Sequence, residues 1–297
     1  MGSLNRRDFI STLTMVAGSA ASLAAPFPEM VEQEKKKWTV GEIMDLFINE
    51  VPGAPFAQTV DTLKSGNRDI VVTGLVTTMF ATVEVIQKAI ALKANFIIAH
   101  EPTFYNHLDE TAWLDNDPVF RYKADLLNRH KIAVWRNHDY IHRLTTDGVR
   151  AGVTKQLQWE KFAGNNPSLF QLPSTNLATL VQHVKEKLGI ATVRYLGDLE
   201  EQVSRVLLLP GAAGGRNQIM AIGREKPDVV LCGEIAEWET AEYVRDARAK
   251  GDKLSLVVLG HVASEEPGSI FLASWLKEKV KGVSTTHVPA GNSLMFA

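Results

Sequence analysis

Three apolar runs in this 297-residue chain end in side chains that bind metal ions. Residues 96–99 lead into His100 and Glu101, residues 132–135 into His138 and Asp139, and residues 256–259 into His261. Such runs are typical of buried parallel strands, and in open α/β sheets ligands collect at the carboxyl ends of the strands. We therefore expect these side chains to converge, although they are far apart in the sequence.

The third run offers one more donor, because Glu265 follows His261 by four residues. A helix that begins there would carry both side chains on one face. Mixed nitrogen and oxygen ligands suit zinc, iron, manganese or cobalt, and carboxylates can bridge two such ions. A water bridging two ions has a depressed pKa and serves as hydroxide near neutral pH, so the pattern indicates hydrolytic chemistry.

The segments between these runs predict alternating strands and helices. Before the strands that carry His100 and Asp139, we expect a strand at 70–72 and helices at 82–92 and 119–129. The second half continues with helices at 176–188, 237–250 and 270–280, and strands at 203–209, 228–232 and 254–259. This alternation predicts an α/β fold of two lobes, with mixed, largely parallel sheets flanked by helices. The pattern weakens at residues 152–172, where we expect a lobe boundary or an irregular crossover.

Composition and charge narrow the classes of function. A formal net charge of −2 and a pI near 6.5, without a basic stripe, argue against nucleic acid as a partner. Cys232 is the single cysteine, so the chain can form neither an internal disulfide nor a cysteine-rich zinc module. Any metal must therefore rest on imidazoles and carboxylates.

The first 25 residues resemble a twin-arginine export signal. Arg6 and Arg7 are followed by Phe9 and by an uncharged, moderately hydrophobic stretch that runs to Ala25. We expect a cleaved signal at residues 1–25, a linker at 26–37, and export of the folded protein to the periplasm; the alternative is an uncleaved, membrane-anchoring start. No other run is long and apolar enough to span a bilayer, so no further membrane contact is expected.

The order and spacing of several motifs resemble the NGG-one-interacting-factor-three family of dinuclear metal-centre proteins. These motifs are residues 94–105, 137–139 with 147–149, 233–234 and 260–265. The resemblance covers most of residues 38–297. It implies two α/β lobes, here 38–155 and 156–297, with two divalent ions (zinc, manganese or iron) near the lobe interface of each subunit. It also implies assembly into hexameric toroids.

The same resemblance nominates His100, Asp139, His261 and Glu265 as metal ligands. Glu101, which we include as a fifth ligand, stands where the family usually has a second histidine. Because Glu is a harder oxygen donor, this change would favour manganese or iron over zinc, or weaken one of the two ions.

Other polar residues near these motifs have two readings. His138 is expected to support a ligand or carry protons rather than bind metal. Glu234 follows Gly233 at a strand end and is a candidate catalytic base or a hydrogen-bond acceptor beside the site. The loop 211–215 is either a tight strand-to-helix turn or a source of N–H groups for an anion. The remaining histidines are expected to be exposed: His107, His130, His142, His183 and His287.

These observations favour a metal-dependent hydrolase of an unknown small substrate, such as a phosphoester, a cyclic amidine or an amide. Relatives implied by the resemblance are often labelled GTP cyclohydrolase homologues, but no motif here reads a guanine or a triphosphate. The alternatives are a non-enzymatic toroid that stores, delivers or scaffolds metal, and a degenerate relative that has lost one ion at Glu101. A catalytic centre keeps an open coordination position, whereas a storage site is closed.

Overall fold

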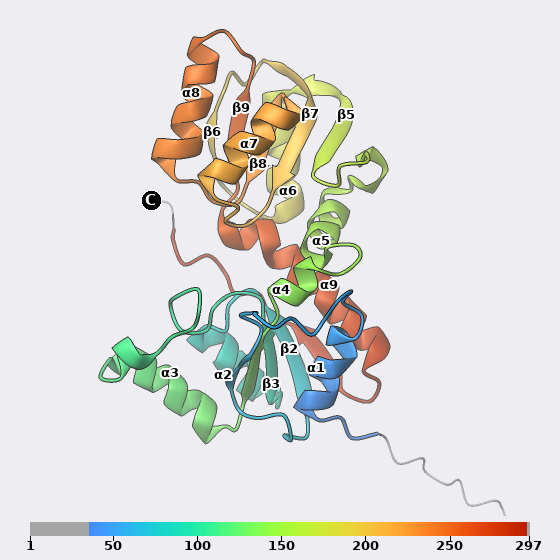
Figure 1. Ribbon diagram of the computed structural model, residues 1–297, viewed down its shortest axis with the longest axis vertical. Coiled ribbons are helices and arrows are strands. Elements are labelled where there is room, and N and C mark those ends of the chain that lie inside the picture. The colour runs from blue at the N-terminus through green and yellow to red at the C-terminus, as the bar shows by residue number, and fades with distance from the viewer. Residues whose placement is uncertain (1–35, 296–297) are drawn as a thin grey trace, which may run out of the picture. The chain divides into compact units, whose positions relative to one another are not determined.

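Two five-stranded sheets organise residues 36–295, the part of the chain that the computed structural model describes (Figure 1). The first sheet has the strand order β1-β4-β3-β2-β10, formed by Leu63–Ser65, Ala133–Arg136, Phe96–Ala99, Gly74–Thr78 and Ser284–His287. The second has the order β5-β7-β8-β9-β6, formed by Leu169–Asn176, Gln202–Leu209, Val229–Cys232, Ser255–Val258 and Arg194–Leu196. The edge strands β1, β5 and β6 are antiparallel to their neighbours, and the other pairs are parallel. The expected α/β fold with mixed, largely parallel sheets is confirmed.

Helices connect the strands in the expected alternation. They are α1 (Val40–Ile48), α2 (Val83–Ala91), α3 (Pro118–Arg129), α4 (Asp139–His142), α5 (Gly148–Leu157), α6 (Leu177–Leu188), α7 (Gly215–Glu225), α8 (Glu242–Ala249) and α9 (His261–Lys279). Short 3₁₀ turns lie at Ala112–Leu114 (η1) and Glu160–Phe162 (η2), and a π-helical segment at Glu237–Ala241 (η3) leads into α8. Thr39, Thr82, Asp117 and Asn176 each accept a backbone hydrogen bond in the first turn of a helix and so determine where it begins. Within residues 36–295, no helix combines the length and apolar character needed to cross a membrane.

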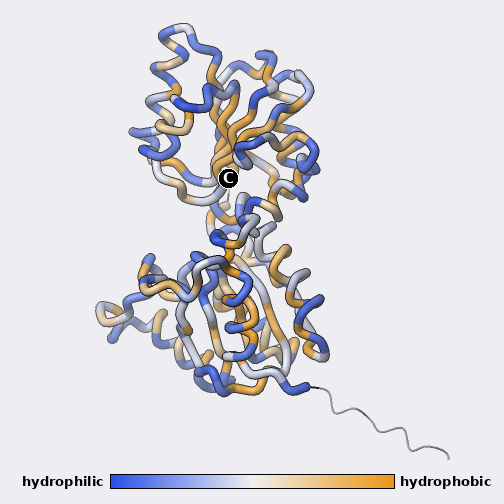
Figure 2. The backbone as a smooth tube through the Cα atoms, turned by 45° about the vertical axis from the view of Figure 1, so that its right-hand side comes forward, coloured by the Kyte–Doolittle hydropathy of each residue, from blue (hydrophilic) through white to orange (hydrophobic). Residues whose placement is uncertain are grey.

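Apolar clusters cover both faces of each sheet, which explains why the central strands read as unbroken apolar runs (Figure 2). On one face of the first sheet, Phe47 of α1 and Leu276 of α9 pack with Trp135 of β4. On the other face, Ile86 of α2 and Leu127 of α3 belong to a second cluster. The strand ends are thus held rigidly, and the residues that follow them are placed at the rims of the sheets.

The sequence predicts a break in the helix and strand pattern at residues 152–172, but the first part of this region is helical. Helix α5 continues through Gly152 to Leu157 and packs along α9. A Cβ atom at Gly152 would lie 2.3 Å from the carbonyl oxygen of Pro267, so the two helices approach to backbone contact. The small residues that weaken the helical pattern in the sequence are those that this close approach requires.

The C-terminal segment returns to the first sheet, because β10 pairs in parallel with β2. The expected second lobe, residues 156–297, therefore includes a strand that belongs to the first sheet. The strand expected at 70–72 is also displaced: Val71 forms only an isolated bridge with Thr39, and the strand proper is β2. The expected signal, residues 1–25, and most of the linker, residues 26–37, lie outside the described residues.

Candidate metal centre

The end of β3 delivers an imidazole and a carboxylate directly. His100 and Glu101 follow the last residue of the strand and are only 4% and 7% exposed. Their backbone N–H groups donate to the carbonyl oxygens of Thr78 and Met79, so the pairing with the neighbouring strand continues past β3. Both side chains are therefore fixed at the carboxyl end of the first sheet, as the sequence predicts.

The end of β4 delivers two more imidazoles through the short helix α4. His138 stands at the N-cap of this helix, and His142 is its last residue. Asp61 fixes the turn, because its two carboxylate oxygens accept from the N–H groups of His138 at 2.8 Å and of Tyr140 at 2.7 Å. The ring centroids of His138 and His142 lie 4.8 Å and 5.1 Å from that of His100. Three imidazoles thus gather at this rim.

Helix α9 supplies the remaining two donors. It begins at His261, nine residues before the helix start expected at residue 270, and the expectation that His261 and Glu265 share one helical face is confirmed. The Nε2 atom of His261 lies 2.9 Å from Oε2 of Glu265. Gly211, in the turn between β7 and α7, makes room for this carboxylate: a Cβ atom there would lie 2.2 Å from its Oε1.

All four imidazoles are oriented in the same way, through Nδ1. The acceptor oxygens are the carbonyl of Asn137 for His100 (3.3 Å) and the carboxylates of Asp139 for His138 (3.0 Å), Asp147 for His142 (3.1 Å) and Glu234 for His261 (3.1 Å). Because a carbonyl or an ionised carboxylate can only accept, Nδ1 must carry the hydrogen in each ring. This tautomer leaves each Nε2 as the atom that can bind a metal ion.

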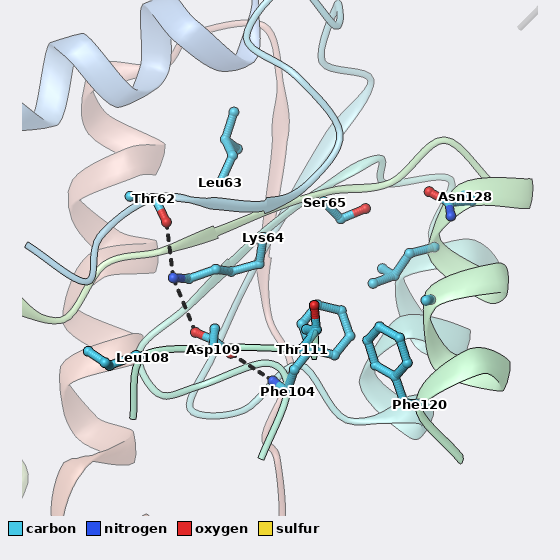
Figure 3. Close-up of a pocket in the computed structure, with 12 residues that line it drawn as sticks. Thr62, Leu63, Lys64, Ser65, Phe104, Leu108, Asp109, Thr111, Phe120 and Asn128 are labelled. Atoms are coloured by element: carbon cyan, nitrogen blue, oxygen red, sulfur yellow. Dashed lines mark hydrogen bonds and ion pairs between the residues drawn. The ribbon is translucent and has the colours of Figure 1, made fainter. Parts of the chain in front are cut away.

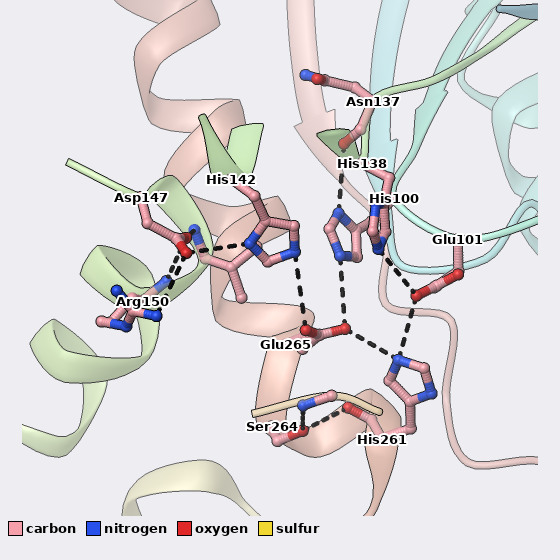
Figure 4. A network of polar contacts seen from close by, with 12 residues as sticks. His100, Glu101, Asn137, His138, His142, Asp147, Arg150, His261, Ser264 and Glu265 are labelled. Carbon is pink, nitrogen blue, oxygen red and sulfur yellow. Dashed lines mark hydrogen bonds and ion pairs between the residues drawn. The ribbon is translucent and has the colours of Figure 1, made fainter. Parts of the chain in front are cut away.

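The four Nε2 atoms face two carboxylates (Figure 4). Their distances to Glu265 are 3.4 Å for His100 and 2.9 Å for His261, both to Oε2, and 4.0 Å for His142, to Oε1. Their distances to Oε1 of Glu101 are 3.2 Å for His261 and 3.8 Å for His138. We call these six residues the His/Glu cluster.

The His/Glu cluster fits a transition-metal ion. Within the described residues, Nε2 of His100 is buried without a hydrogen bond, although Oε2 of Glu265 lies within ion-pair distance at 3.4 Å. Two subsets place donor atoms within 4.8 Å of one another: His100 with His138 and His142, and His100 with Glu101 and Glu265. Imidazole nitrogen combined with carboxylate oxygen suits zinc, manganese or iron. These buried groups could hold a metal ion.

The carboxylates of the cluster draw positive charge to the site. Burial alone lowers the pKa of His261, but its hydrogen bonds with Glu101 and Glu265 outweigh burial and raise that pKa to about 10. For Glu265, burial acts to raise the pKa, but His100 and His261 hold it well below its usual range. Burial, together with the charge of His100, lowers the pKa of His138 to about 4, so its ring is neutral at pH 7. A divalent cation would supply the same positive charge in place of protons.

A row of buried charges holds Glu101. The guanidinium of Arg136, fully buried, lies 3.2 Å from Oε2 of Glu101 and 3.7 Å from Asp109. Lys64 pairs with Asp109 at 3.2 Å and donates to Thr62, beside a separate cavity of about 340 Å³ (Figure 3). Glu101 therefore shares its negative charge with Arg136, whereas the ion-pair partners of Glu265 within residues 36–295 are all imidazoles.

The structure places the side chains of His138 and Asp139 differently from the sequence expectation. The carboxylate of Asp139, expected as a ligand, accepts from the hydroxyl of Thr59 at 2.8 Å and the N–H of Val60 at 3.1 Å, and it orients His138. Neither donor subset includes Asp139 or His261, but only His261 directs a free donor atom, Nε2, at the two carboxylates of the cluster. His138, expected only to support a ligand, instead directs Nε2 at the cluster. The reason is that α4 begins at Asp139, which turns the two neighbouring side chains in different directions.

His142 is the residue that sequence reasoning missed. We expected it to be exposed, but it is partly buried and belongs to a donor subset. The available signal was its spacing from His138, which equals the four-residue spacing of His261 and Glu265. Asp147 was missed as well; it caps α5 with Oδ1 and holds His142 with Oδ2.

The other expected positions have mixed outcomes. His107 and His130 are exposed as expected, whereas His183 and His287 are partly buried. Glu234 contacts His261, although its side chain is 55% exposed. Residues 211–215 form the expected strand-to-helix turn between β7 and α7.

A cavity of about 1180 Å³ opens onto the cluster. Its lining includes five of the six cluster residues, namely Glu101, His138, His142, His261 and Glu265. Phe80, Tyr105 and Lys123 also line it. The cluster is therefore accessible to a small molecule.

Comparison with known proteins places these residues in a family. The family described as Duf34/NIF3 (NGG1p interacting factor 3) matches residues 41–291. The "GTP cyclohydrolase 1 type 2 homolog" of Clostridium acetobutylicum is 21% identical over 248 residues, which cover 78% of this chain and 87% of that protein. Its namesake in Clostridium perfringens is 22% identical over 235 residues, with 73% and 83% covered.

Solved structures share the fold at low sequence identity. Hypothetical protein SA1388 of Staphylococcus aureus has a TM-score of 0.70 at 18% identity, covering 88% of this chain and 99% of that one. A Bacillus cereus protein related to NIF3 has a TM-score of 0.70 at 17% identity, covering 89% and 99%. Because the family match extends from α1 to beyond β10, the chain belongs to the Duf34/NIF3 (NGG1p interacting factor 3) family.

Proposed function

We propose that this protein is a hydrolase that depends on two divalent transition-metal ions, zinc, manganese or iron, held by the His/Glu cluster. The observation that carries this proposal is the common orientation of its four imidazoles, each with Nδ1 bound to an oxygen. Four rings prepared in this way around two carboxylates form a donor set larger than the three or four protein ligands of a typical single zinc site. A pair of ions accounts for this number of donors.

Glu265 is placed to serve both ions. Its Oε2 faces His100 and His261, whereas its Oε1 faces His142. A carboxylate whose two oxygens face different imidazoles is suited to bridging. When bound, divalent ions lower the pKa of water and stabilise the negative charge that develops during hydrolysis.

The remaining residues orient the donors and shape the space above them. Asp139, Asp147 and Glu234 hold their imidazoles in one tautomer, and Arg136 holds Glu101. The cavity over the cluster is large enough for a small substrate. Phosphoesters, cyclic amidines and amides are all candidate substrates. Because the clostridial relatives are named GTP cyclohydrolase homologues, a cyclic amidine of the purine type should be tested first.

Metal content is the direct test. The chain is purified without chelator and its bound metal measured by elemental mass spectrometry, beside His261→Ala and the control His130→Ala, which removes an exposed imidazole outside the cluster. We expect about two ions per chain in the wild type and the control, and fewer than one in His261→Ala. The metal-loaded protein is then assayed on the three substrate classes.

Each outcome decides between functions. Absence of metal even after reconstitution would overturn the proposal. Two ions without turnover on any of the three classes would favour the alternative, a protein that stores or delivers metal. One ion per chain would support the hypothesis that the protein has lost one of two metal ions because Glu101 replaces a histidine.

We also propose that the protein assembles with copies of itself, as the hexamer that the family resemblance implies. Large apolar side chains are exposed within residues 108–122, namely Leu108, Trp113, Val119 and Tyr122. Exposed apolar groups gathered in one segment are typical of interaction surfaces. Light scattering should give about six times the chain mass, and Trp113→Asp should lower it; a monomeric wild type would contradict the proposal.

Export by the twin-arginine route is a further proposal, supported by the pattern of residues 6–25. Cell fractionation should find the chain in the periplasm. The double variant Arg6→Lys, Arg7→Lys should retain it in the cytoplasm. Equal distribution of wild type and variant would count against the signal.

A further inference from the structure

Lys123 is a buried cation in the wall of the cavity that opens onto the His/Glu cluster. It lies on α3, is 5% exposed and lines the cavity. Its Nζ donates to the carbonyl oxygen of Thr103 at 2.5 Å and lies 5.3 Å from the ring centroid of Tyr105. An ammonium group has three donors, and this one has a single acceptor among the described residues.

Comparison with Lys64 shows what Lys123 lacks. Lys64 is also buried, but it has the carboxylate of Asp109 at 3.2 Å and the hydroxyl of Thr62 at 3.0 Å (Figure 3). Within residues 36–295, Lys123 forms no ion pair. Asp109 is committed to Lys64 and Arg136, and the nearby Glu84 is exposed to water. A buried charge without an opposite charge beside it is costly, and a bound anion would offset that cost.

A second unpartnered group lies beside Lys123. The hydroxyl of Thr103 is buried without any hydrogen bond within the described residues, and Thr103 is 1% exposed. Thr103 and Lys123 line the same cavity, as do Glu101 and His138 of the cluster. An ammonium group with a single acceptor and a hydroxyl with none, both counted within the described residues, therefore share one space with the metal-binding side chains.

We propose that Lys123 and Thr103 form an anion subsite, which binds a phosphate or carboxylate group of the substrate while the metal centre acts on another part of the same molecule. This assignment names the substrate class of the proposed hydrolase and rests on that function for its catalytic half. An oxyanion would accept from the ammonium and the hydroxyl together, which satisfies both buried groups. The substrate is therefore a small molecule that carries a negative charge.

The charge of Lys123 makes the subsite dependent on pH. Burial lowers the pKa of this ammonium to about 8, although the charges of Asp109 and Glu84 partly oppose the effect. The group is mainly protonated at neutral pH and loses its charge as the pH rises above about 8. A bound anion would favour the protonated form.

The test measures binding of inorganic phosphate, and separately of acetate, to the metal-loaded protein by calorimetry. Lys123→Met removes the charge and keeps an unbranched side chain, Lys123→Arg keeps the charge, and Lys88→Met is the control at an exposed lysine of α2. We expect phosphate or acetate affinity to fall about tenfold or more in Lys123→Met, but not in Lys88→Met. The anion that responds identifies the group, phosphate or carboxylate.

A pH series separates binding from a structural role. Wild-type affinity should fall above pH 8, whereas Lys123→Arg should keep its affinity through pH 9, because guanidinium remains charged. Lys123→Met should melt no lower than wild type, since it removes an unpaired buried charge. Affinity that is equal in wild type and Lys123→Met would overturn the subsite.

The metal content of each variant distinguishes this proposal from the proposed function. If the wild type holds metal but phosphate and acetate bind independently of Lys123, the subsite is wrong and the metal centre stands. If the wild type holds no metal but still binds either anion through Lys123, the hydrolase is wrong and the subsite stands. Thr103→Val, which removes only the hydroxyl, should weaken binding less than Lys123→Met, because a neutral hydrogen bond contributes less than a charged one.

Discussion

The two sheets contribute to the candidate metal centre in different ways. At the rim of the first sheet, donors come from the strand ends and the short helix after them: His100, Glu101, His138 and His142. At the rim of the second sheet, glycines stand where the strands end, and Gly211 and Gly233 pack against α9. The donors on that side, His261 and Glu265, are carried by the helix.

In this site, one lobe supplies donors on its strand ends, and the other leaves space for a helix that carries donors. The first rim is a fixed platform, because His100 and Glu101 continue the backbone pairing of a buried strand and Asp61 fixes the turn that carries His138. The second rim is a recess: a Cβ at Gly233 would lie 2.4 Å from the hydroxyl of Ser264. Because Gly211 and Gly233 have no side chain, the first turn of α9 can enter at these two positions.

The largest expected effect is the loss of metal affinity when Glu265, rather than Glu101, is replaced. Glu265→Gln should lower metal affinity about a hundredfold or more, because Glu265 faces three imidazoles and no other cation within the described residues. Glu101→Gln should lower it less, because Arg136 already shares that carboxylate. Metal titration by calorimetry measures both, and equal losses would show that the two rims contribute alike.

The recess is tested at two glycines that both have a positive φ, Gly211 and Gly214. Gly211→Ala should reduce metal affinity about tenfold or more and destabilise the fold by ~2–4 kcal/mol, since its Cβ would strike Glu265. Gly214→Ala also has a positive φ but open space around it, so it should cost ~1–3 kcal/mol of backbone strain and leave metal binding unchanged. Urea denaturation and metal titration provide the readouts, and equal behaviour of the two variants would refute the recess.

The platform depends on the carboxylates that orient its imidazoles. Asp147→Asn and Asp139→Asn should each lower metal affinity about 10–100-fold by weakening the Nδ1 contacts of His142 and His138. Asn at position 147 can still cap α5, so the free energy of unfolding should change little. Unchanged affinity in Asp139→Asn would restore the possibility that His138 is not a ligand.

The smallest expected effect is at Glu234, the exposed orienting carboxylate on the second rim. Glu234→Gln should change metal affinity by less than about threefold, because water screens an exposed contact. If Glu234 is instead the catalytic base, turnover should fall about 100-fold or more with metal still bound. Steady-state kinetics on a metal-loaded variant tells these roles apart.

Much of this arrangement can be predicted from the sequence, because it depends on local patterns. Unbroken apolar runs predict strands buried on both faces, and the polar residues that follow them must lie at the rims of the sheets. The four-residue spacing of His261 and Glu265 is likewise local, and the structure keeps it. These features identify four members of the cluster: His100, Glu101, His261 and Glu265.

The directions in which the side chains of His138 and Asp139 point could not be predicted in this way. Neighbouring residues at a strand end point in different directions, and which one enters the site depends on how the chain turns next. Here Asp61, nearly 80 residues away, caps the turn and starts α4 at Asp139. That long-range contact fixes the turn from which both His138 and His142 reach the cluster.

The sequence by itself determined where the strands β3, β4, β7, β8 and β9 lie and which side chains at their ends can bind metal, because these follow from residue type and spacing. Only the tertiary structure decided which of those side chains meet. It did so through contacts between distant segments: glycines that admit α9, the aspartate that turns α4, and a polar C-terminal strand that returns to the first sheet. Each depends on packing between distant elements, which no local pattern records.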